Sequence, residues 1–127
     1  MSKPNNRGEL TIVVAGRTLI LKPTFTALDE LESRLNTGVF AMLQTFSDVK
    51  GLRLGTIANV LHCGAVGGMG KAAPSLEEIG DLVLKEGATN VMEHVAAFIQ
   101  MAVLSPEQIA ESEAEAEAEK EATKVGE

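Results

Sequence analysis

The sequence is poor in aromatic residues, with four Phe, no Tyr and no Trp among 127 residues. Few rings are therefore left to stack on bases or sugars, which argues against binding of nucleic acids or carbohydrates. The single cysteine, Cys63, cannot close an intrachain disulfide. No apolar run approaches the roughly 18 residues that would span a bilayer. Together with the polar start at residues 1–8, these absences predict a cytosolic protein without a membrane segment.

Charge is abundant but unevenly placed along the chain. The net charge is −7, and residues 107–127 carry eight acids against two lysines, which is a net of −6. The rest of the chain is nearly neutral, so neither part favours an anionic partner. The length and the apolar content of 45% are enough for one core. We therefore predict one domain over 1–106 and a flexible, acidic, Ala/Glu-rich tail over 107–127.

An antiparallel β-hairpin is predicted near the start of the chain. Apolar and polar residues alternate over 9–14 and again over 18–22, and the dipeptide Ala15-Gly16 between them is typical of a tight turn. Pro23 ends the second strand because it cannot donate to the ladder. An isolated hairpin is marginal in water, so one of its faces must rest on helices.

Four or five α-helices are expected after the hairpin. The first should begin at Thr24 or Thr26, whose hydroxyl can accept from an early backbone N–H, with Asp29 and Glu30 in its first turn. Apolar spacing predicts the others at 38–46, 54–65, 76–86 and 89–104, with stops or caps at Asn36 and Gly38, Ser75, Gly87 and Pro106. The predicted fold class is α+β: a two-stranded hairpin followed by four or five helices and a disordered acidic C-terminal tail.

The stretch AVGGMGKAAP, residues 65–74, invites comparison with a phosphate-binding loop. That loop needs a first glycine where Ala65 stands, a hydroxyl where Ala72 stands, and a preceding strand where a helix is predicted. We therefore predict a flexible joint between two helices, with Lys71 as a solvated charge. The glycines of this joint are Gly64, Gly67, Gly68 and Gly70.

No other residue group predicts catalysis or metal binding. His62 and Cys63 are neighbours on one helix, where adjacent side chains point apart, so they do not form a base and a nucleophile. Cys63 is interpreted as a small buried hydrophobe, and His62 and His94 as helix-surface residues. The acid pairs Asp29-Glu30 and Glu77-Glu78 are explained by the dipoles of the helices they begin. We expect no catalytic residue, no cofactor and no metal.

The segment GVFAMLQTF has more apolar positions than a helix with one buried face needs. Two interpretations remain open, core filling and an adaptable surface for apolar segments of a partner. Under the second interpretation the chain should also self-associate. The candidate partner-binding residues are Val39, Phe40, Met42, Leu43, Phe46 and Met101.

Two stretches of the sequence resemble a known family. They are GELTIVVAGRTLILKPTFTALDELE, where a hairpin runs into a Leu/Glu helix, and LRLGTIANVLHCGA, which precedes a glycine break and the Ser-capped SLEEIGDLV. The chain is similar over about residues 8–104 to the small tail assembly chaperones of long-tailed bacteriophages, in particular those of gene transfer agents and related prophages.

The resemblance implies a non-enzymatic assembly factor in the host cytoplasm. Its partners would be the tape-measure protein, a long helical rod prone to aggregate, and the major tail protein that polymerises around that rod. A homo-oligomer is expected, and neither nucleic acid nor a membrane is an expected partner. The alternative is a structural component of the tail tube or of another tail-associated part of the virion.

Overall fold

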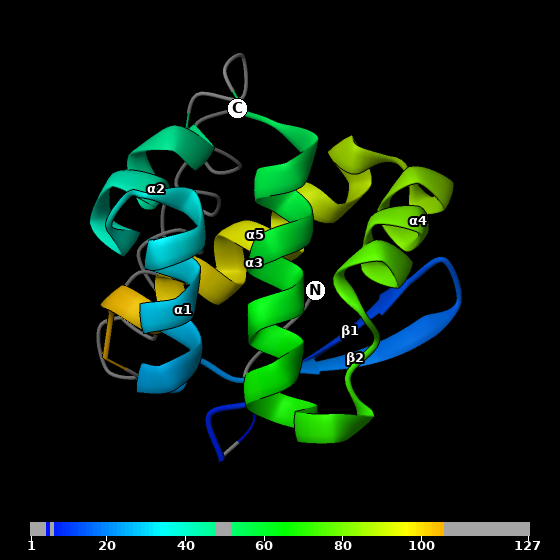
Figure 1. The fold of residues 1–127 in the computed structure, drawn as a ribbon, viewed down its shortest axis with the longest axis horizontal. Helices are drawn as coiled ribbons and strands as arrows, with labels where there is room; N and C mark the ends of the chain where they lie inside the picture. The colour runs from blue at the N-terminus through cyan, green and yellow to red at the C-terminus, as the bar shows by residue number, and fades with distance from the viewer. Residues whose placement is uncertain (1–4, 6, 48–51, 106–127) are drawn as a thin grey trace, which may run out of the picture.

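The computed structural model describes residues 5, 7–47 and 52–105 (Figure 1). The elements are β1 (Leu10–Val14), β2 (Arg17–Leu21), α1 (Phe25–Leu35), α2 (Val39–Ser47), α3 (Leu54–Met69), the short 3-10 helix η2 (Gly70–Ala72), α4 (Leu76–Glu86) and α5 (Ala88–Val103). The α+β class and the hairpin followed by five helices are thus confirmed. The predicted tail, 107–127, lies outside the described residues.

The hairpin forms as its alternation predicts. β1 and β2 pair antiparallel, with Leu10 opposite Leu21 and Val14 opposite Arg17. Ala15 and Gly16 both have positive φ, 49° and 82°, as the tight two-residue turn that matches strand twist requires. One face of the pair is completely or almost completely buried, through Leu10, Ile12, Val14, Leu19 and Leu21. This face rests on the helices.

The first helix begins where its threonine cap predicts. The Oγ1 of Thr24 accepts from the backbone N–H of Ala27 at 3.1 Å. The expected first-turn position of Asp29 and Glu30 is wrong, because α1 starts at Phe25 and no acid lies in its first turn. Glu30 instead bonds Arg34 one turn later, at 3.0 Å. The left-handed stop is Asn36 alone (φ 51°), since Gly38 has no positive φ.

The glycine-rich stretch is helix and not a flexible joint, which corrects the prediction. α3 continues through Gly64, Gly67 and Gly68 to Met69, and only Gly70, with a φ of +59°, ends it. A Cβ on Gly67 would collide with the carbonyl oxygen of Lys22, and one on Gly68 with that of Ile20. The glycines are therefore needed for close packing of α3 against β2.

The last two helices follow the predicted caps closely. The Oγ of Ser75 accepts from the N–H of Glu78 at 3.2 Å, and Glu77 and Glu78 lie in the first turn of α4. Gly87, with a φ of 96°, separates α4 from α5. In Figure 1, α3 stands in the middle of the fold, with α1 and α2 on one side of it and α4 on the other. Buried side chains from both strands and all five helices form one core cluster.

Candidate partner-binding groove

The six candidate residues occupy different environments in the structure. Met42 and Phe46 point into the core, with exposed fractions of 2% and 8%. Val39, Leu43 and Met101 are half-buried and pack against that core, which joins α2 to α5. Phe40 is the exception, because 72% of its surface is exposed. One side of α2 therefore fills the core, whereas Phe40 is exposed to solvent.

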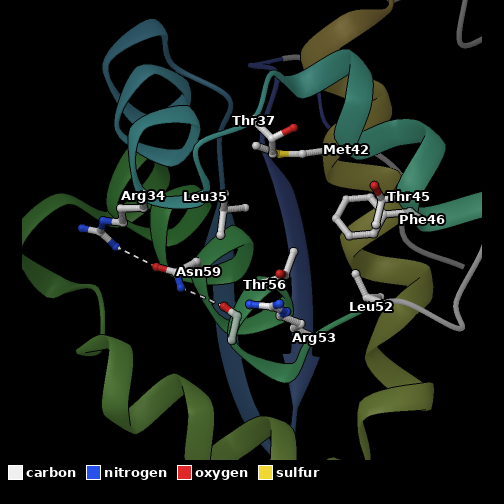
Figure 2. Close-up of a pocket in the computed structure, with 11 residues that line it drawn as sticks. Arg34, Leu35, Thr37, Met42, Thr45, Phe46, Leu52, Arg53, Thr56 and Asn59 are labelled. Carbon is white, nitrogen blue, oxygen red and sulfur yellow. Dashed lines mark hydrogen bonds between the residues drawn. The ribbon is translucent and has the colours of Figure 1, made fainter.

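A groove of about 450 Å³ lies where α1, α2 and the start of α3 meet (Figure 2). Its apolar lining includes Met42 and Phe46, so these two core side chains also contact the groove. The rim is polar, and the described lining contains two arginines and no carboxylate. The apolar lining residues are Leu35, Met42, Phe46 and Leu52, and the polar ones include Arg34, Thr37, Thr45, Arg53, Thr56 and Asn59.

The corner between α1 and α2 is fixed by Glu32. Its Oε2 accepts from the backbone N–H of Val39 at 3.1 Å, so a carboxylate of α1 satisfies a free N–H at the start of α2. Its backbone oxygen accepts from the N–H of Thr37 at 3.2 Å and closes the end of α1. These two bonds to Glu32 set how the chain turns from α1 into α2, whose position is also held by its packing against the core. No sequence motif of α1 or of α2 predicts this bond between Glu32 and α2.

Arg34 joins α1 to α3 on the rim. Its guanidinium lies 3.0 Å from the Oε1 of Glu30, 3.4 Å from the Oδ1 of Asn59 and 2.9 Å from the Nδ1 of His62. Arginine remains protonated, so Arg34 donates to Nδ1 and the imidazole proton is on Nε2. Burial, and then the positive charge of Arg34, hold the pKa of His62 below its usual 6.5. Neutral His62 thus accepts a hydrogen bond from Arg34 of the rim without lining the groove itself.

Arg53 is the second cation of the groove. It lies directly before α3, is exposed, and makes no side-chain cap with that helix. Within the described part of the chain, its guanidinium has no hydrogen-bond partner, whereas Arg34 has three. The groove therefore offers one fixed and one available guanidinium beside an apolar floor. Such an arrangement suits an apolar segment that also carries an acidic or carbonyl group.

The residues considered for chemistry are not brought together. Lys71 is exposed on η2, at the other end of α3 from the groove. Cys63 is buried, and desolvation raises the pKa of its thiol, which disfavours the nucleophilic thiolate. No group of three metal-ligating side chains occurs in the described ranges. None of the helices that the structure describes is long and apolar enough to cross a membrane.

A second hollow of about 400 Å³ lies between α1 and α3. It is lined by Thr24, Thr26, Ala27, Glu30, Arg34, Cys63, Val66 and Gly67. Its carboxylate and guanidinium already bond one another, through Glu30 and Arg34. The hollow therefore has fewer unpaired polar groups than the groove at α2, and the groove is the stronger candidate for a partner.

Comparison with known proteins gives one finding. Residues 7–105 match the model of a family described as phage tail tube protein, GTA-gp10. No curated protein and no solved structure matches the chain. The matched range includes both strands, all five helices and every residue that lines the groove. The chain therefore belongs to the GTA-gp10 family of phage tail tube proteins.

Proposed function

We propose that this tail-related protein is a tail assembly chaperone, which covers an apolar segment of the tape-measure protein until the tail tube forms. The observation that carries the proposal is the groove at α2, with its apolar floor and its rim of arginines and hydroxyls. An apolar helix face laid into such a groove is a recurrent mode of peptide recognition. The action is reversible burial of surface and not bond chemistry.

The exposed side of α2 offers the client a second apolar contact, outside the lining of the groove. Phe40 is 72% exposed although it is one of only four aromatic residues. The ring is therefore free to add apolar contact area to a bound segment. The client would bury Phe40 and the apolar floor together, and the major tail protein would displace it as the tube grows. This activity would take place in the host cytoplasm.

Co-expression with a tape-measure fragment tests the proposal. The wild-type chain should keep the fragment soluble. Thr45→Arg, which places a long side chain in the groove, and Phe40→Ser should each lower the soluble fraction. Leu84→Ser is the matched control, because Leu84 is also exposed, at 64%, but lies on α4. Equal solubility with all three variants, or insolubility with the wild type, would contradict the proposal.

A structural role in the tail tube is a second candidate, and the family description favours it. A tube subunit must present complementary surfaces that repeat around and along the tube, so many copies stay in the particle. Mass spectrometry of purified particles separates the two roles. Many copies per particle would support the structural role, and absence from the particle together with client solubilisation would support the chaperone.

A further inference from the structure

The two outer edges of the hairpin differ in what covers them. Because the turn has two residues, Val14 and Arg17 form a hydrogen-bonded pair. Such pairs alternate along the hairpin, so the backbone groups of the residues between them point away from the partner strand. The backbone groups of Ile20 and Lys22 therefore point out of β2, where α3 meets them. The N–H of Lys22 donates to the oxygen of Gly64 at 3.0 Å, and Gly67 and Gly68 pack on the carbonyls. The edge of β2 is therefore covered at Ile20 and Lys22.

The edge of β1 is closed only at its two ends. At one end, the N–H of Glu9 donates to Oδ1 of Asn5 at 2.9 Å, and its carbonyl accepts from the N–H of Asn5 at 2.8 Å. At the other end, the N–H of Ala15 donates to Oε1 of Glu86 at 3.3 Å. Between these ends, the N–H and C=O groups of Thr11 and Val13 point outward without a partner in the described part of the chain.

This open stretch lacks the usual protection of an edge strand. Natural edges carry a charge, a proline or a bulge that prevents pairing with another chain. β1 reads LTIVV, without a charged residue or proline, and its register with β2 is continuous. Val13 is 52% exposed, and both Thr11 and Val13 are β-branched, which favours a strand.

We propose that β1 pairs antiparallel with β1 of a second copy of this chain, about a two-fold axis beside Ile12. In this register Thr11 of each copy faces Val13 of the other. Each of the two resulting pairs exchanges both N–H···O bonds, so all four open groups of each copy find a partner. The two hairpins become one four-stranded sheet, and its end residues keep their bonds to Asn5 and Glu86.

The segments of this chain outside the described residues are poor alternatives for the same edge. Residues 1–4 include Pro4, and residues 48–51 number only four. The acidic segment 106–127 is rich in Ala and Glu, which are depleted in strands. A second copy, in contrast, supplies an identical strand with the required pattern. This interface is separate from the groove, so it stands or falls independently of the proposed chaperone role.

Sedimentation equilibrium of the full chain tests the pairing, with Val13→Lys and Thr18→Lys as matched variants. Val13 and Thr18 are opposite each other on the exposed face of the hairpin, so both variants add the same charge to the same face. The wild type and Thr18→Lys should dimerise. Val13→Lys should lose the dimer, because the two lysines are diagonal neighbours across the axis. Thermal melting confirms that each variant folds.

Hydrogen exchange of the wild type gives an answer that needs no variant. Exchange of the Thr11 and Val13 amides should slow as the protein concentration rises into the range of the dimer. A monomer at every concentration would overturn the proposal. So would a dimer that leaves these two amides unprotected, or one that Val13→Lys and Thr18→Lys weaken equally, because its interface would then lie elsewhere.

Discussion

The two ends of α3 have different surroundings. Against the hairpin, its glycines allow backbone to approach backbone, and no room is left for an added methyl group. At the opposite end, near α2, α3 lines an open groove with Arg53, Thr56 and Asn59. One end of α3 is therefore closed by backbone contacts that only glycine permits, while the other end borders a groove open to solvent.

The largest expected effect on stability separates a buried from an exposed aromatic residue. Phe98 is fully buried, so Phe98→Ala should cost about 3–5 kcal/mol of unfolding free energy. Phe40→Ala should change that free energy by less than about 0.5 kcal/mol, because the ring is mostly exposed. Urea unfolding measures both values. Similar losses for the two variants would mean that the exposed wall of α2 is in fact part of the core.

The next largest effect concerns the glycine contact. Gly68→Ala should lower the unfolding free energy by about 1–3 kcal/mol, since the methyl group meets the carbonyl of Ile20. Gly80→Ala is the control, because nothing lies within 4 Å of a Cβ at that mid-helix position of α4. It should raise the unfolding free energy by about 0.4–1 kcal/mol. A higher unfolding free energy for both variants would show that α3 does not pack closely against β2.

Helix caps should have smaller effects on both sides of α3. Thr24→Ala and Ser75→Ala each leave one N–H of a first turn without its side-chain acceptor. Each should cost about 1 kcal/mol of unfolding free energy. Serine at position 24 should retain most of the stability, because it keeps the hydroxyl. A Thr24→Ser variant as unstable as Thr24→Ala would assign the effect to the lost methyl group instead.

The smallest effect is a pH dependence of stability at His62, which bonds Arg34 of the groove rim. The pKa of His62 is lower in the folded protein than its usual 6.5, so the unfolded chain takes up the proton first as pH falls. Stability from neutral His62 should be fully present above pH 6.5 and decrease as pH falls below this value. The contribution of His62 is isolated by the difference in unfolding free energy between the wild type and His62→Gln, measured across that pH range. A difference independent of pH would contradict the shifted pKa.

Local signals predicted much of the fold. Alternation located the hairpin, and Thr24, Ser75 and Gly87 located helix ends, because each acts through bonds to nearby residues. The glycines of α3 were misread because their role depends on β2, more than forty residues earlier in the sequence. A glycine in a helix and a glycine in a joint look alike until the opposing backbone is known.

The groove was only partly predictable. The surplus of apolar residues singled out α2, and two of the residues named from the sequence, Met42 and Phe46, line the groove. Sequence reasoning missed Arg34, Arg53, Leu35 and Leu52, because lining residues from three helices converge only after folding. The bond from Glu32 to α2 spans seven residues and has no motif of its own.

NMR mapping of a client peptide would show whether the groove at α2 is the binding site. The isotope-labelled chain would be titrated with an apolar helical peptide from a tape-measure protein. Binding in the groove should change the chemical shifts of Thr45, Arg53, Thr56 and Asn59 and leave those of α4 nearly unchanged. Absence of binding, or changes concentrated on α4 with an unaltered groove, would contradict the proposed site.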